Sequence, residues 1–398
     1  MLLIYLKRIL LLNKPKEIAV YVHWPFCAKK CPYCDFNSHV SKQEINYKDW
    51  ETAYKNEINI EQDNLGGKIV RSIFFGGGTP SLMPPNLVDS IIHNIGKKWT
   101  ITNKTEITVE ANPSSVEIKN FKHLAVNGVN RLSLGLQSLN DDSLKFLGRN
   151  HKAKDSLKAL EIAKNNFDRV SFDLIYGLPL QTTVTWEREL ADAISLSGEH
   201  MSAYQLTIEK GTPFYSMHRD KKIVLPSESS LLNLYMITDS MLKNAKLEKY
   251  EVSNYALKNA ESIHNVKIWE GFEYCGIGPG AHGRIKKNNK WFATHKYSSP
   301  NIWLSRNLKG DSSLYKNDII PPRERAQEIL LTSLRLTKGI KIKTLYENTN
   351  IKKLDTFINI DNLSKLQKVG LIHTNHESLK ITNKGFPLLD TIINKLLL

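Results

Sequence analysis

The sequence predicts an α/β fold: an incomplete (β/α)6 TIM-like barrel, followed by a C-terminal winged-helix-like α+β domain. Three observations lead to this prediction. Continuously apolar runs alternate with helical patterns from residue 18 to about residue 210. Polar residues that could bind a ligand or a metal come directly after those runs. The last 80 residues show a different pattern, which indicates several helices and a hairpin. Continuous apolar runs are typical of parallel strands that are buried on both faces. A doubly wound sheet is the alternative, since a complete barrel would need two further strand–helix units.

The apolar runs and the helical patterns define six repeats. The strands are expected at residues 18–22, 69–75, 106–109, 131–136, 170–175 and 202–206. The helices between them are expected at 47–61, 85–97, 117–126, 141–163 and 184–196, with Ser41, Pro85, Ser115 and Asn140 near the helix starts. Residues 211–320 are less regular and show one helical stretch at 227–245. We therefore divide the chain into a leader (1–17), a core barrel (18–210), a segment that completes the barrel (211–320) and a C-terminal domain (321–398).

The N-terminal residues are apolar, but Lys7 and Arg8 interrupt them and no small-residue cleavage site follows. This pattern is too short to cross a bilayer and does not match a secretory signal. We expect a surface helix or a leader, and a cytoplasmic protein.

The C-terminal domain begins after Pro321-Pro322, with helices expected at 323–336, 342–348 and 361–369 and a hairpin that turns near 375–378. A winged helix raises the hypothesis of DNA binding. The third helix carries only Lys365 and Lys368 against Asp361. The chain has a net charge of +15, but the lysines are spread along it. Nucleic acid is therefore not the expected partner.

Three of the four cysteines lie within eight residues, as Cys27, Cys31 and Cys34, with the spacing C-x3-C-x2-C. A disulfide framework would spread its cysteines, so the cluster indicates thiolate ligation of a metal. Zinc sites and ferredoxin clusters both use four protein ligands as a rule. Three thiolates suit a [4Fe–4S] cubane with one iron open to an exchangeable ligand; a zinc loop completed by His23 or His39 is the alternative. Cys275 is expected to be a buried small residue.

Further candidates follow the next strands: Gly77, Gly78 and Thr79 after the second, Glu110 after the third, Gln137 after the fourth and Asp173 after the fifth. Parallel α/β folds build their sites at the carboxyl ends of strands, so these residues are expected to share one cleft. Glycines allow close approach of a ligand to the backbone.

The segments YVHWPFCAKKCPYCDF, FFGGGTPS, VEANP, RLSLGLQS, FDLIYGLP and GIGPGAH together resemble radical S-adenosylmethionine (SAM) proteins of the oxygen-independent coproporphyrinogen III oxidase group. The resemblance covers residue 18 to the C-terminus. It implies that the cysteines bind the cluster, that the open iron binds SAM, and that the cluster, once reduced by one electron, cleaves the carbon–sulfur bond of SAM. The residues implied to contact SAM are Tyr21, Tyr33, Gly77, Gly78, Thr79, Glu110, Gln137, Arg149 and Asp173.

Within that group, Phe36 favours the heme chaperone branch, because resemblance to the oxidase would call for cysteine at this position. The short stretch before the first strand favours the same branch. This branch is implied to bind heme and pass it to apoproteins such as respiratory cytochromes, with possible transient contact with a membrane. His264, in the segment HNVKIW, is the candidate heme ligand, although Ile268 replaces the tyrosine of the resembling motif; His282 is a second candidate. The alternative function is oxidative decarboxylation of coproporphyrinogen III.

Overall fold

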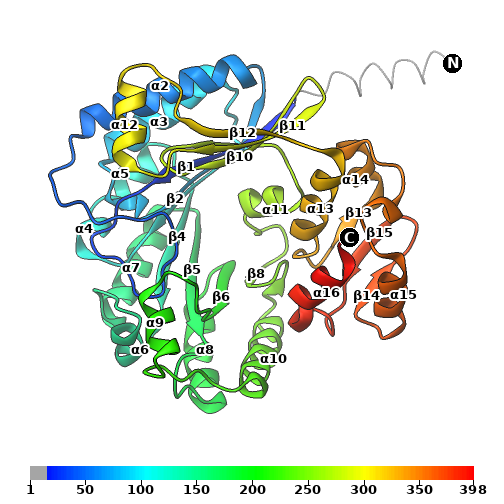
Figure 1. Ribbon diagram of the computed structural model, residues 1–398. Coiled ribbons are helices and arrows are strands. Elements are labelled where there is room, and N and C mark those ends of the chain that lie inside the picture. Colours follow the sequence, from blue (N-terminus) through cyan, green and yellow to red (C-terminus); the bar gives the residue numbers. More distant parts are fainter. Residues whose placement is uncertain (1–15) are drawn as a thin grey trace.

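The computed structural model describes residues 16–398 (Figure 1). In this range twelve strands form one sheet in the order β12-β11-β10-β9-β1-β2-β3-β4-β5-β6-β8-β7. The six predicted strands occupy the middle of this sheet, where they lie side by side in chain order and run parallel to one another. They are β1 (Glu17–Trp24), β2 (Ile69–Gly77), β3 (Glu106–Ala111), β4 (Arg131–Gln137), β5 (Arg169–Tyr176) and β6 (His200–Gln205). The prediction of an α/β fold is confirmed.

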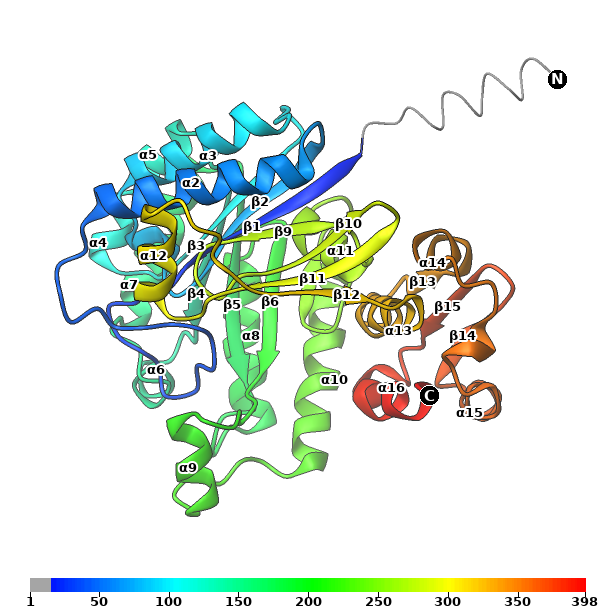
Figure 2. The same cartoon turned by 45° about the horizontal axis from the view of Figure 1, so that its top comes forward.

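Helices cover one face of the parallel strands (Figures 1 and 2). They are α2 (Tyr47–Leu65), α3 (Pro85–Lys98), α4 (Ser115–Ile118), α5 (Phe121–Val126), α6 (Asp141–Phe146), α7 (Ala153–Asn166) and α8 (Thr183–Leu196). Val20, Ile73 and Leu132 lie in the apolar core of this part of the chain. Because side chains alternate along a strand, neighbours such as Tyr21 and Ser72 point to the opposite, concave face.

Two predicted helices are interrupted. The stretch 117–126 forms α4 and α5, and the stretch 141–163 breaks into α6 and α7. The second break contains Gly148 at φ +70°, where an added Cβ would lie 2.6 Å from Pro32. Ser115 is the first residue of α4, as expected, with Ser114 as its cap, whereas Asn46 rather than Ser41 caps α2. Asn140 caps α6 as predicted.

Residues 211–320 contribute six further strands that the sequence patterns did not reveal. These are β7 (Glu248–Lys249), β8 (Asn254–Ala256), β9 (Tyr274–Ile277), β10 (His282–Lys287), β11 (Lys290–Lys296) and β12 (Leu314–Ile320). Strand β9 pairs in parallel with β1, whereas the other new pairings are antiparallel. Short or half-exposed antiparallel strands lack the continuous apolar run by which the central strands were found. The helices of this segment are α9 (Pro213–Arg219), α10 (Glu228–Asn244), α11 (Ile263–Trp269) and α12 (Pro300–Leu308).

The C-terminal elements have a hydrophobic core of their own. They are α13 (Pro322–Ser333), β13 (Ile340–Lys341), α14 (Ile342–Thr349), α15 (Ile360–Lys368), β14 (Ile372–Thr374), β15 (Ser378–Ile381) and α16 (Leu389–Leu396). The strands form a small antiparallel sheet in the order β13-β15-β14, which confirms the predicted helices and hairpin. Both views show this unit beside α10 and α11. The domain limits at 17, 210 and 320 stay predictions.

The leader predicted at residues 1–17 lies almost entirely outside the described residues. Among residues 16–398, no helix combines the length and the apolarity that crossing a membrane requires.

Candidate functional site

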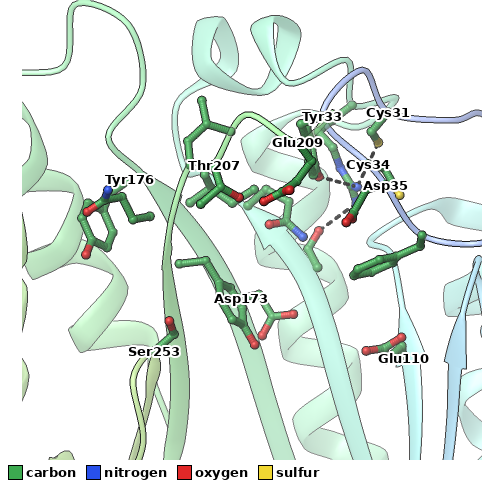
Figure 3. A pocket seen from close by; sticks show the side chains of 18 of the residues that line it. Cys31, Tyr33, Cys34, Asp35, Glu110, Asp173, Tyr176, Thr207, Glu209 and Ser253 are labelled. Carbon is green, nitrogen blue, oxygen red and sulfur yellow. Dashed lines mark hydrogen bonds between the residues drawn. The ribbon is translucent and has the colours of Figure 1, made fainter. Parts of the chain in front are cut away.

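A cavity of about 890 Å³ opens at the carboxyl ends of the parallel strands (Figure 3). Its lining brings together most of the residues singled out from the sequence: Cys27, Cys31, Tyr33, Cys34, Gly77, Gly78, Thr79, Glu110, Gln137, Arg149 and Asp173. Figure 3 shows Cys31 and Cys34 on one side of the cavity and Tyr176 and Ser253 on the other. Glu110 and Asp173 lie below the cysteine loop in that view. The strand-end residues therefore do share one cleft.

The three cysteines lie on the loop between β1 and α2. Two backbone hydrogen bonds shape the loop, from Cys27 N to the His39 carbonyl (2.8 Å) and from Cys34 N to the Cys31 carbonyl (3.1 Å). All three thiols are partly exposed. Burial raises the pKa of the Cys27 thiol, and a hydrogen bond with Thr79 and the charge of Arg149 oppose this rise. Thiolates are the form that binds iron, so both neighbours favour ligation.

No fourth donor completes a zinc site on this loop. His23 is buried, and its Nε2 lies 2.9 Å from the carbonyl of Asn37. The ring of His39 is engaged too, with Nε2 3.0 Å from Asn37 Oδ1. Within the described residues, no three His, Cys, Asp or Glu side chains are placed to hold a single metal ion. A cubane does not require such a group, because each thiolate binds a different iron. The donor set fits a three-cysteine [4Fe–4S] cluster better than zinc.

Arg149 follows α6 and reaches the cysteine loop. Its Nη1 lies 3.4 Å from both Cys31 Sγ and Tyr33 Oη. Its Nη2 donates to the Gly135 carbonyl at 3.0 Å and also to Asn112. The guanidinium therefore places a positive charge at the junction of the cysteine loop and the strand ends.

The glycine-rich loop after β2 packs directly on the cysteine loop. Gly78 N donates to the Trp24 carbonyl (2.7 Å) and Thr79 N to the Phe26 carbonyl (2.9 Å). Gly77 has φ +108°, and an added Cβ would lie 2.4 Å from His23 Cε1. Only glycine can adopt this backbone conformation so close to the His23 ring. The loop thus offers bare backbone to the cavity, as the sequence suggested.

Glu110 on β3 and Asp173 on β5 are half-buried acids whose pKa values are shifted toward neutrality. Burial and the nearby charge of Asp173 raise the pKa of Glu110 to about 8, although the Gly77 N–H opposes the rise. Burial also raises the pKa of Asp173 to about 6, opposed by Ser202 and by Arg131 and Arg149. Carboxyl groups held in this way favour a cationic or hydroxyl-bearing ligand that would replace lost solvation.

Of the predicted SAM contacts Gln137 and Tyr21, Gln137 lines the cavity and Tyr21 does not. Gln137, at the end of β4, lines the cavity with a φ of +70°, which is unusual for a residue other than glycine. Tyr21 is not part of the lining. Its hydroxyl donates to His23 Nδ1 (3.0 Å), and since His23 Nε2 donates to Asn37, Tyr21 supports the cysteine loop from below. Burial raises the pKa of Tyr21.

His264, the predicted heme ligand, does not line the cavity either. Its side chain packs against β2, with Nδ1 2.9 Å from Ser72 Oγ and the ring stacked on Phe74 at 4.8 Å. The residue is 6% exposed, and burial lowers its pKa to about 4. Its backbone N–H donates to Glu106. In this conformation the imidazole is a buried structural group, so its assignment as a ligand has no support from its position.

Several residues of the cavity were missed by the sequence reasoning. Asn112 belongs to the recognised VEANP segment, which could have revealed it. The far part of the cavity is lined by Tyr176, Tyr204, Leu232, Arg335 and Leu388, among others. The last three come from the segment after residue 210 and from the C-terminal elements, and no spacing in the sequence connects them to the cysteines.

Comparisons with known proteins identify the family to which this fold and this site belong. Residues 21–193 match the radical SAM superfamily, and residues 320–388 match the HemN C-terminal domain. The heme chaperone HemW of Buchnera aphidicola is 35% identical over 377 residues, covering 94% of this chain and 97% of that protein. A mitochondrial radical S-adenosyl methionine domain-containing protein 1 from Danio rerio is 31% identical over 390 residues, covering 96% and 87%.

Among solved structures, the coproporphyrinogen III oxidase HemN of Escherichia coli matches with a TM-score of 0.80 at 21% identity, covering 96% of this chain and 90% of that one. At this identity the match shows the fold. With the cysteine loop, the shared cavity and the curated relatives, it leads to one conclusion: the chain belongs to the HemN/HemW family of radical SAM proteins.

Proposed function

We propose that the protein is a heme chaperone that carries a [4Fe–4S] cluster and SAM and delivers heme to apo-hemoproteins. Phe36 is the observation that favours a chaperone over an oxidase. It stands where resemblance to the oxidase calls for a further cysteine, and the residue is 59% exposed and lines the cavity. Three curated relatives at 32–35% identity are named heme chaperones, which supports the same choice. A cytoplasmic site of action and respiratory cytochromes as acceptors belong to this proposal.

The residues around the cavity have distinct roles in the proposal. Cys27, Cys31 and Cys34 hold the cluster, which supplies an electron for cleavage of SAM when both are bound. Arg149 pairs with the methionine carboxylate, and the backbone of Gly77, Gly78 and Thr79 receives the methionine end. Glu110 and Asp173 bind the amine and the ribose hydroxyls, with Gln137 and Tyr33 as further polar contacts and Tyr21 acting through His23.

One anaerobic assay separates the two functions. The reconstituted protein is given coproporphyrinogen III, SAM and a reductant, and in parallel it is titrated with hemin. We expect saturable hemin binding and no protoporphyrinogen above the level of a cluster-free control. Rapid formation of protoporphyrinogen would show that the protein is the oxidase instead.

The cluster assignment has a matched control within the chain. Cys31→Ala is expected to lose the visible absorption of the cluster and most of the about four irons per chain that a cubane supplies. Cys275→Ala is expected to keep both, because Cys275 is buried on β9 and does not line the cavity. Equal iron content in the two variants would contradict the assignment.

A further inference from the structure

We propose that Asn37 is a positioning residue for the cluster: it holds the cysteine loop against the segment GIGPGAH (276–282), so that the cluster keeps a fixed place beside the glycine loop. The inference goes beyond the choice between chaperone and oxidase and rests only on the three-cysteine cluster of the proposed function. It also gives a role to a segment that the sequence singled out and that does not line the cavity.

The cysteine loop has an outgoing limb and a returning limb on either side of its cysteines. The outgoing limb lies on the glycine loop, because Thr79 N donates to the Phe26 carbonyl (2.9 Å). The two limbs are joined where Cys27 N donates to the His39 carbonyl (2.8 Å). The returning limb, residues 35–39, is fastened to the rest of the protein by Asn37.

Asn37 uses both ends of its side-chain amide for this purpose. Its Nδ2 donates to the carbonyls of Pro279 (3.0 Å) and Ser298 (3.1 Å). Its Oδ1 accepts from His39 Nε2 (3.0 Å), and its backbone carbonyl accepts from His23 Nε2 (2.9 Å). One residue therefore connects the loop to β1, to the turn between β9 and β10 and to the end of β11.

The segment GIGPGAH is shaped to receive this side chain. Gly280 has φ +78°, and an added Cβ there would lie 2.4 Å from Asn37 Nδ2, so a larger residue would push the loop away. The segment is itself fixed, since Gly280 N donates to the Tyr297 carbonyl (2.9 Å). His282, the second candidate heme ligand, ends the segment; its ring stacks on His295 at 4.0 Å and does not line the cavity.

Movement of the returning limb would reach the cluster through Cys34. This cysteine comes three residues before Asn37, and its Sγ lies 3.7 Å from Ser38 Oγ on the same limb. Groups that orient metal ligands and limit solvent access control how firmly a metal centre is held and how it behaves. A displaced Cys34 would open the cluster to chelators and shift it relative to Thr79, where the methionine end of SAM is proposed to bind.

Two substitutions disturb this contact from opposite sides. Asn37→Asp keeps the acceptor for His39 but cannot donate to the two carbonyls, and Gly280→Ala places a methyl group against an unchanged Asn37. In the cluster-loaded full chain, each is expected to lose iron to a chelator at least about tenfold faster, which corresponds to about 1.4 kcal/mol of easier loop opening. Each should also reduce the change that SAM causes in the electron paramagnetic resonance spectrum of the reduced cluster.

Each substitution has a matched control. The side chain of Asn130 also joins two backbone segments, accepting from Ile107 N (2.8 Å) and donating to the Thr105 carbonyl (2.9 Å), but it lies at the amino ends of β3 and β4 and does not line the cavity. Gly310 has φ +75°, close to that of Gly280, yet an added Cβ there meets nothing within 4 Å. Asn130→Asp and Gly310→Ala should therefore lower stability without faster loss of iron.

A second measurement does not need the cluster. In the full-length protein before cluster loading, hydrogen exchange at the amides of Cys27 and His39 reports opening of the loop, because each amide donates to a carbonyl of the opposite limb. Asn37→Asp and Gly280→Ala should speed this exchange at least about tenfold, and the two controls should not.

The possible failures are distinguishable. Wild-type rates of iron loss and exchange in Asn37→Asp, or equal increases in Asn130→Asp, would overturn this inference and leave the cluster assignment intact. A wild-type chain that binds no cluster would overturn the three-cysteine assignment and this inference together.

Discussion

Glu110 and Asp173 show how single residues acquire their properties from position. Both lie on parallel strands of the sheet, and in isolation each would be an ordinary acid or helix cap. Burial at the base of one cavity places their pKa values near 8 and 6. The free protein therefore holds the Glu110 carboxyl mostly protonated at neutral pH, which affects how it receives a cation.

SAM binding is expected to be coupled to loss of a proton from Glu110. Because the SAM ammonium favours the carboxylate, a group with a raised pKa must release its proton before pairing, so affinity rises with pH. Between about pH 6.5 and pH 7.5, below the usual pKa of an α-amino group, the Kd should fall by up to about tenfold. Calorimetry at several pH values measures this. Glu110→Gln should bind more weakly with a flat profile, and a flat wild-type profile would contradict the coupling.

Among the helices and strands, the central parallel strands could be predicted from the sequence, whereas the helix boundaries and the outer strands could be predicted only in part. The six parallel strands were found within a few residues because each is continuously apolar. The break between α6 and α7 was missed, because Gly148 is required by its contact with Pro32 in the distant cysteine loop. Strands β9 to β12 were missed because pairing with neighbouring strands, on both sides for β9 to β11 and on one side for β12, makes them strands, and not an apolar run.

The junction of the cysteine loop with the glycine loop gives a prediction at this scale. Gly77→Ala should lower the stability of the protein by about 1–3 kcal/mol and reduce SAM binding, since it combines a strained φ with overlap on His23. Gly128→Ala is the control, because φ there is +93° but an added Cβ meets nothing within 4 Å. Urea unfolding of both variants measures the difference. Equal losses would show that the contact with His23 does not matter.

For the whole molecule, a buried ion cluster connects segments far apart in the sequence. Lys296 on β11 pairs with Glu57 (3.2 Å) and Glu61 of α2. Glu57 also accepts from Gly278 N (2.6 Å) and Trp303 Nε1 (3.1 Å). These contacts connect β11 and the loop that precedes His282 to helix α2.

Lys296→Met is expected to destabilise the protein by about 3–5 kcal/mol, because it leaves two carboxyl groups buried without their cation. Combining it with Glu57→Gln and Glu61→Gln should recover much of this loss, since the buried charge is then removed. Urea unfolding under reducing, anaerobic conditions compares the variants. A triple variant less stable than Lys296→Met would show that the hydrogen bonds of the carboxylates, and not their charge, are what the fold requires.

The sequence by itself determined the parallel α/β core, the three-cysteine loop and the strand-end residues that meet at one cavity. These features depend on local apolar runs and on the rule that parallel strands end at one edge. Only the tertiary structure decided that His264 is buried, that Tyr21 acts beneath the cysteine loop, and that His282 meets His295. The burial of His264 depends on packing against Ser72, 192 residues away along the chain, and the other two depend on how side chains meet on the folded strands; neither composition nor spacing records these contacts.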